Sequence, residues 1–367
     1  MSAPFRIFAT GDIGGEALKR LTERGWALEV YPKIEPPPKA LILEKVRSGI
    51  DALITTLRDP IDEEVFAAGK GLKIVAQMAV GFDNISRQSA NAHKIPFSNT
   101  PDVLTDATAE FAFLILCCVA RKTWPSEDMV RAKKWTTWHP YEPFLGDEVT
   151  GKTVAVIGTG RIGKSFIKKA IGFDMDVLCY DSAYQDTAFV ESARRVMEVR
   201  HREGLVPRLQ TIAYTSFDDA LARADFVTLH VALTREGESK EPTFHLMNEE
   251  RFRKMKPTAY LVNTSRGPVV DEAALVKALR AGWIAGAALD VFEKEPLPDD
   301  SALRDPDLVL KLRLFNHFAS AGRATRLSPD ENVGMAGRTV QAVIDVLEAR
   351  YGGDPKKMPY IVNKEAF

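Results

Sequence analysis

Short apolar runs alternate with helical stretches along the first hundred residues. Four of the runs, RIFAT, ALEVY, DALITTL and LKIVAQMAV, are typical of buried strands, and segments such as EALKRLTER and LILEKVRSG have helical spacing. This alternation predicts a parallel sheet with helices on its faces. The prolines of KIEPPPKA cannot lie inside a helix, so we expect a loop there, directly before the next helix.

The rest of the chain repeats this pattern. A long apolar stretch over residues 108–121 predicts a buried helix. A second series of apolar runs then follows, which predicts another parallel sheet: KTVAVIG, DVLCYD, DFVTLHVAL, AYLVNTS, IAGAALDVF and LRLFNHF. Residues 329–350 have largely helical spacing and predict one amphipathic helix. The predicted fold class is α/β, with two doubly wound parallel-sheet domains.

Length, charge and composition exclude several classes of function. The 367 residues exceed the size at which one hydrophobic core keeps growing, so two domains are expected. With a net charge of −1 the chain has no broad basic field, and we expect no nucleic-acid partner. It shows neither a membrane-length apolar run nor a secretion signal, so we expect a cytoplasmic protein without membrane contact. The 3 cysteines and 6 histidines lack ligand spacing, and no metal site is expected.

A glycine-rich loop follows the strand TVAVI and precedes a predicted helix. In such a GxGxxG loop the first glycine permits a tight turn, the second lets the backbone approach a pyrophosphate, and the third allows close helix packing. The free N–H groups at the helix start then face the phosphates. The expected cofactor contacts are Gly158, Thr159, Gly160, Arg161, Ile162 and Gly163.

An acidic residue ends the next predicted strand, DVLCY. Asp181 stands at the distance expected for a carboxylate that hydrogen-bonds the ribose of NAD, and its charge should repel a 2′-phosphate. NAD(H) is therefore the favoured cofactor. The long segment 182–214 carries Arg194, Arg195, Arg200 and Arg202, which we expect on a solvated helix face. Since one of these arginines could reach a 2′-phosphate, NADP(H) stays possible.

Three further segments complete a recognisable order. After the glycine loop come Arg266 in NTSRG, Glu295 in DVFEKEP and His317 in NHFASA. This order closely resembles the D-isomer-specific 2-hydroxyacid dehydrogenases, most of all their glyoxylate and hydroxypyruvate reductases, and the resemblance extends over nearly the whole chain. It implies a Rossmann cofactor domain (residues 105–317) inserted in a split flavodoxin-like substrate domain (residues 1–104 and 318–367).

The resemblance assigns catalytic roles that the chemistry of these residues supports. Reduction of a 2-keto acid places negative charge on the carbonyl oxygen, which a protonated His317 can stabilise and protonate. A neighbouring carboxylate, Glu295, favours the imidazolium form. The guanidinium of Arg266 can bind the substrate carboxylate and reach the keto oxygen, a geometry that lysine cannot copy.

Other roles follow from the resemblance alone. Val80 and Gly81, in AVGFDN, would offer N–H groups to the substrate carboxylate, and Thr105 and Thr264 would lie near the cofactor. Asp290 resembles the residue that hydrogen-bonds the nicotinamide carboxamide, although it could equally be a turn residue.

The segment WTTWHP resembles a stretch that crosses the interface of a homodimer. Trp138 would then enter the partner's substrate pocket, although tryptophans at this spacing are equally common as core or interface anchors. The predicted reaction is the NAD(P)H-dependent reduction of glyoxylate or hydroxypyruvate to the D-2-hydroxy acid. The alternatives are a related dehydrogenase for pyruvate or a bulkier 2-keto acid, and a dinucleotide-sensing interaction protein like the C-terminal binding protein corepressors.

Overall fold

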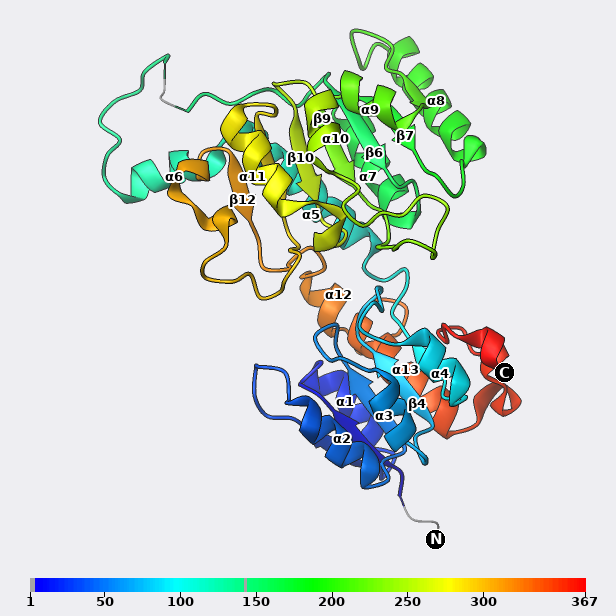
Figure 1. Ribbon diagram of the computed structural model, residues 1–367. Helices are drawn as coiled ribbons and strands as arrows, with labels where there is room; N and C mark the ends of the chain where they lie inside the picture. The colour runs from blue at the N-terminus through cyan, green and yellow to red at the C-terminus, as the bar shows by residue number, and fades with distance from the viewer. Residues whose placement is uncertain (1–3, 142–143) are drawn as a thin grey trace. The chain divides into compact units, whose positions relative to one another are not determined.

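The computed structural model describes residues 4–141 and 144–367, which form two compact units (Figure 1). Unit 1 consists of Met1–Leu104 and Ser320–Phe367, and unit 2 of Thr105–Ala319. Among the described residues, no helix is both long and apolar enough to cross a membrane.

Unit 1 is built on a five-stranded parallel sheet with the order β2-β1-β3-β4-β5. This is the flavodoxin-like order. Both faces of the sheet are covered, which is why every residue of β3 and β4 is buried. The strands are β1 (Arg6–Ala9), β2 (Ala27–Val30), β3 (Ala52–Thr55), β4 (Ile74–Gln77) and β5 (Phe97–Ser98).

Helices from both ends of the chain cover this sheet. Ile7 and Ala9 of β1 pack with α1 (Gly15–Thr22) and α13 (Met335–Leu347) on one face. Phe8, between them in sequence, packs on the other face with α2 (Lys39–Arg47), α3 (Glu63–Ala68) and α4 (Arg87–Ala92). Helix α2 begins directly after Pro38, so the predicted proline-rich loop is confirmed.

The prediction of one helix over residues 329–350 is wrong at both ends. A short helix, α12 (Arg323–Leu327), ends before Pro329, and α13 begins only at Met335. Between them the Asp330 carboxylate accepts the N–H of Asn332 at 2.8 Å, so turn hydrogen bonds replace helical ones. After α13, Ala349 adopts a left-handed backbone with φ 50°, which ends the helix.

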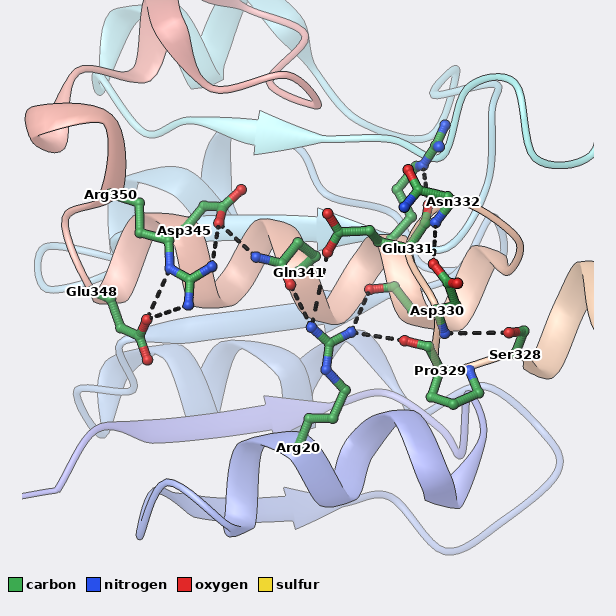
Figure 2. Close-up of polar contacts among 12 residues, drawn as sticks. Arg20, Ser328, Pro329, Asp330, Glu331, Asn332, Gln341, Asp345, Glu348 and Arg350 are labelled. Atoms are coloured by element: carbon green, nitrogen blue, oxygen red, sulfur yellow. Dashed lines mark hydrogen bonds and ion pairs between the residues drawn. The ribbon is translucent and has the colours of Figure 1, made fainter.

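A chain of polar contacts fixes α13 to α1 (Figure 2). Arg20 of α1 donates to the carbonyl of Pro329 at 2.8 Å and to the side chain of Gln341. Gln341 in turn donates to the buried Asp345 at 2.7 Å, and Arg350 lies 3.6 Å from the same carboxylate. The returning segment is thus tied to the first helix by hydrogen bonds as well as by apolar packing.

Unit 2 is built on a seven-stranded parallel sheet with the order β12-β11-β10-β9-β6-β7-β8. This is the Rossmann order with one additional strand. All strands are parallel, and the point at which the strand order reverses lies between β6 and β9. The strands are β6 (Thr153–Ile157), β7 (Asp176–Tyr180), β8 (Ile212–Tyr214), β9 (Phe226–Leu229), β10 (Tyr260–Asn263), β11 (Gly286–Leu289) and β12 (Leu312–Leu314). The predicted fold class is confirmed, although the sequence analysis anticipated neither β5 nor β8.

Helices cover both faces of this sheet as well (Figure 1). One core contains residues of α5 (Thr105–Arg121), α7 (Arg161–Gly172) and α8 (Thr187–Arg202). The other contains residues of α9 (Phe217–Arg223), α10 (Glu249–Lys254) and α11 (Glu272–Ala281). The short α6 (Thr123–Arg131) buries Trp124. About half of the long segment 182–214 is a regular crossover helix, α8.

Candidate active site

The glycine loop joins β6 to α7 and is closed on two sides by backbone. A Cβ atom at Gly158, which has φ 92°, would lie 2.7 Å from the carbonyl of His230. A Cβ at Gly163 would lie 2.0 Å from the carbonyl oxygen of Gly158. At Gly160 nothing lies within 4 Å of the same position, so the loop is open where α7 begins. This is the arrangement that lets a pyrophosphate approach a helix N-terminus.

Asp181 lies directly against this loop. One carboxylate oxygen accepts the N–H of Thr159 at 2.8 Å, and the other accepts those of Ala183 at 3.0 Å and Tyr184 at 3.1 Å. Asp181, which the sequence proposes as the ribose ligand, is therefore hydrogen-bonded to the glycine loop through Thr159.

The arginines of α8 have other contacts. Arg200 donates to Asp174 at 2.8 Å, and Arg194 donates to the carbonyl of Ile212 at 3.2 Å. Asp174 precedes β7 and Ile212 begins β8, so both contacts lie at the amino ends of the strands, opposite the glycine loop. Arg195 and Arg202 contact neighbours on their own helix and its C-cap. The contacts of Arg194 and Arg200 hold α8 on the sheet.

Glu295 and His317 form a hydrogen-bonded pair. The Glu295 Oε2 and His317 Nδ1 atoms are 2.8 Å apart, and Glu295 Oε1 accepts the N–H of Phe292 at 3.0 Å. Burial alone would raise the pKa of Glu295, but the hydrogen bond and charge of His317, with the charge of Arg266, hold it below its usual value. The contacts of Glu295 therefore favour its carboxylate form.

Arg266 lies on the turn after β10, near the charge of Glu295. Asn263, the last residue of β10, donates to the carbonyl of Arg266 at 2.9 Å and accepts the N–H of Ser265 at 3.0 Å, which fixes the turn. Thr264 is buried, and its hydroxyl has no hydrogen-bond partner in the described part of the chain. A buried hydroxyl without a partner is costly unless a ligand satisfies it.

Asp290 shapes the loop that carries His317. Its carboxylate accepts the N–H groups of Phe318 at 2.6 Å and Ala319 at 2.9 Å, and its carbonyl accepts that of His317 at 2.8 Å. Since burial outweighs these hydrogen bonds, the pKa of Asp290 is raised. His317 itself has φ 56°, a left-handed conformation that is uncommon outside glycine and tends to occur at functional sites.

Val80 and Gly81 lie in unit 1, on the loop after β4. Asn99 donates to the carbonyl of Val80 at 2.8 Å, and Gln77 donates to that of Gly81 at 2.6 Å. The N–H groups of Val80 and Gly81 donate to no acceptor within the described residues. Their carbonyls are thus held in place while their donors are available, as a site for an anion requires.

Thr105 and Trp138 stand apart from the hydrogen bonds of the acid–base pair. Thr105 begins α5, and Trp138 is 76% exposed in the segment that follows α6. Within residues 4–141 and 144–367, no hydrogen bond or ring contact joins either residue to Arg266, Glu295 or His317.

His230 was not among the predicted site residues, although the run DFVTLHVAL places it where a buried strand ends. It follows β9, and its carbonyl supports Gly158. Its ring lies 5.3 Å from that of Phe166, and desolvation lowers its pKa to about 3. A neutral histidine therefore stands behind the glycine loop.

Known proteins match most of this chain. A model of the D-isomer specific 2-hydroxyacid dehydrogenase NAD-binding domain matches residues 113–312. A glyoxylate reductase from Korarchaeum cryptofilum is 43% identical over 322 residues, which are 88% of each chain. One from Thermofilum pendens is 42% identical over 362 residues, 98% of this chain and 95% of the relative. The crystal structure of a Thermus thermophilus protein has a TM-score of 0.81 at 36% identity, with 98% of this chain and 100% of that chain covered.

The Rossmann sheet, the open glycine loop and the orphan hydroxyl of Thr264 fit a nicotinamide dinucleotide, and together with the histidine–carboxylate pair they define a nicotinamide-dependent oxidoreductase. The chain belongs to the D-isomer-specific 2-hydroxyacid dehydrogenase family. It is an enzyme that acts on the CH–OH group, and its substrate is a small 2-hydroxy or 2-keto acid. The predictions of family and enzyme class are confirmed.

Proposed function

We propose that the protein reduces glyoxylate to glycolate, or hydroxypyruvate to D-glycerate, with NADH. The observation that carries the proposal is the 2.8 Å contact between His317 and Glu295, with the charge of Arg266 acting on the same carboxylate. The names of the relatives support the choice of substrate, since those from Korarchaeum and Thermofilum are both called glyoxylate reductase.

Glu295, His317 and Arg266 have different roles in the reaction. Glu295 holds Nδ1 of His317, so the imidazolium donates its proton to the keto oxygen from Nε2. Arg266 binds the substrate carboxylate and stabilises the charge that develops on the keto oxygen. The N–H groups of Val80 and Gly81 bind the carboxylate as well. The dihydronicotinamide, when bound, supplies the hydride.

Four residues and the glycine loop hold the cofactor. The N–H groups at the start of α7 bind the pyrophosphate, and Asp181 binds the adenosine ribose and repels a 2′-phosphate, so NADH is preferred. The buried hydroxyl of Thr264 faces the cofactor, and Thr105 lies near the cofactor. Asp290 lies toward the carboxamide while it holds the loop of His317.

The enzyme acts as a homodimer. Large apolar side chains gather in the segment after α6, where Trp135 is 58%, Trp138 76% and Tyr141 79% exposed. Such a cluster is costly in water, and a second copy of the chain would cover it, with Trp138 entering the partner's substrate pocket. Light scattering should give the mass of a dimer, and a monomer at working concentration would remove this role of Trp138.

The test is steady-state oxidation of NADH, and separately of NADPH, with glyoxylate, hydroxypyruvate, pyruvate and a bulky 2-keto acid. Turnover of NADH with either of the first two acids is the expected result. Turnover only with pyruvate or the bulky acid would move the enzyme to another substrate within the family. No turnover with any of the four acids and either nicotinamide would refute the proposal.

A further inference from the structure

Two glutamates join the loop of Arg266 to the loop of Glu295. The N–H of Glu272, the first residue of α11, donates to the Glu293 carboxylate at 3.0 Å. The N–H of Glu293 donates back to the Glu272 carboxylate at 2.7 Å. We call this reciprocal pair of hydrogen bonds the glutamate clasp. Hydrogen bonds between N–H groups and carboxylates are charge-assisted, and they are stronger than neutral ones.

The two segments also touch through their backbones beside the clasp. Gly267 follows Arg266 and begins a short 3₁₀ helix, Gly267–Val269. A Cβ atom on Gly267 would lie 1.8 Å from the carbonyl of Phe292 and 2.5 Å from the nitrogen of Glu293. No side chain fits there, so the turn after Arg266 rests directly on the backbone that leads to Glu295.

A histidine braces the clasp from a third segment. His245 Nε2 lies 3.1 Å from the same Glu293 oxygen that accepts the N–H of Glu272. The N–H of His245 donates to the carbonyl of Pro268 at 2.7 Å, within the turn after Arg266. Glu293 is therefore held against both the Arg266 turn and the start of α11.

The glutamate clasp lies close to Glu295 in sequence, and the charge of Glu295 acts on it. Burial raises the pKa of Glu272, and the carboxylates of Glu293 and Glu295 raise it further. Glu293 stands two residues before Glu295. The Glu295 carboxylate accepts the N–H of Phe292, which directly precedes Glu293, and contacts His317. A shift of Glu293 would therefore move the carboxylate that orients His317.

We infer that Glu272 and Glu293 are positioning residues that set the separation between Arg266 and the Glu295–His317 pair. This inference rests on the proposed function, because only a reaction that uses both groups depends on their separation. A slide of either loop would break both hydrogen bonds of the clasp. Misplacement of reacting groups by about 1 Å can lower turnover on the order of 100-fold.

The main experiment compares Glu272→Ala with Glu272→Gln. The alanine variant loses the acceptor for the Glu293 N–H, so we expect kcat to fall on the order of 10- to 100-fold while the Kd of NADH is unchanged. The glutamine amide oxygen can still accept that hydrogen bond, so Glu272→Gln should keep kcat within about 3-fold of wild type. Failure of glutamine to rescue would overturn the inference.

Glu249→Ala is the matched control. Glu249 is the first residue of α10 after its Asn248 cap, as Glu272 is the first residue of α11 after its Asp271 cap. Both changes remove an acidic residue from the first turn of a helix, so both lose the same kind of interaction with the helix dipole. Of these two glutamates only Glu272 contacts Glu293, so Glu249→Ala should leave kcat unchanged. An equal loss of kcat in both variants would overturn the inference.

Two further measurements keep the test decisive. If Glu272→Ala does not fold, Glu293→Asp shortens the clasp by one methylene, and unchanged kcat there would refute the role of the clasp. Hydrogen exchange over residues 291–295 should be faster in Glu272→Ala than in Glu249→Ala, whatever the substrate. A wild-type enzyme inactive on every 2-keto acid would refute the proposed function, whereas an active wild type with equally active clasp variants would refute only the clasp.

Discussion

His230 should make unit 2 sensitive to acid. Its pKa is lowered from 6.5 to about 3 because its ring is desolvated against Phe166, and its hydrogen-bond contact is Thr228 at 3.0 Å. The unfolded chain binds a proton at this residue below its ordinary pKa, whereas the folded chain does not. Stability is therefore complete above that ordinary pKa and is lost as the pH falls toward the folded value.

The size of the loss follows from this linkage. At about pH 5 an unfolded histidine of ordinary pKa is mostly protonated, which favours unfolding by about 2 kcal/mol. This figure hardly depends on the folded pKa as long as that value stays below about 4. For a unit of roughly 200 residues, about 2 kcal/mol corresponds to a fall in Tm of about 4–8 °C.

The assay is the Tm of wild type and of His230→Gln between about pH 7.5 and about pH 5. The variant should be less stable at neutral pH, and the difference should shrink by about 2 kcal/mol at the lower pH because glutamine does not titrate. His201→Gln is the control, since His201 is exposed at the end of α8. Parallel curves for wild type and His230→Gln would refute the reasoning.

Three other changes test the cofactor loop and the acid–base pair. His317→Asn, which tolerates the left-handed backbone, should lower kcat on the order of 10²- to 10⁴-fold and leave the Kd of NADH unchanged; unaltered turnover would exclude His317 as the acid. Asp181→Ala should weaken NADH binding and raise the kcat/KM ratio of NADPH to NADH, and a constant ratio would exclude the ribose contact. Gly163→Ala should abolish NADH binding in a fluorescence titration, because its Cβ would meet the carbonyl of Gly158 at 2.0 Å. Gly172→Ala, on the same helix with nothing within 4 Å, should retain NADH binding, and equal effects of the two changes would refute the packing argument.

The sequence predicted most of the fold because its strands are buried on both faces. Runs such as TVAVI and AYLVN are continuous and apolar, and each is a central strand of unit 2. Two edge strands were missed: β5 (Phe97–Ser98), which has two residues, and β8 (Ile212–Tyr214), which has three and exposes Ala213. An apolar run this short does not distinguish a strand from a loop.

The error over residues 329–350 has a different origin. Periodicity reports which face of a segment is buried, but it does not report hydrogen bonds made by side chains. The Asp330 carboxylate forms a turn instead of a helix, and the Pro329 carbonyl is bound by Arg20, more than 300 residues away in sequence. Long-range contacts of this kind cannot be read from the local pattern.

In the candidate site, too, local motifs could be recognised from the sequence but long-range contacts could not. Arg266, Glu295 and His317 could be proposed from the sequence because each stands in a recognisable motif after a buried strand or close to one. The clasp residues Glu272 and Glu293 stand in the same motifs, but isolated acids are usually solvated and gave no signal. Their importance appears only when the structure shows that each carboxylate accepts the other's N–H.

The loop of His317 is held in its left-handed conformation at a cost in stability. A non-glycine residue in this region costs about 1–2 kcal/mol, so an isolated chain would rarely adopt it. Asp290 offsets that cost with its bonds to Phe318 and Ala319, yet burial raises the pKa of Asp290, which means that its own ionised form is destabilised by the fold. The arrangement is explained if the position of the imidazole matters more than the stability of the loop, as it must for a general acid.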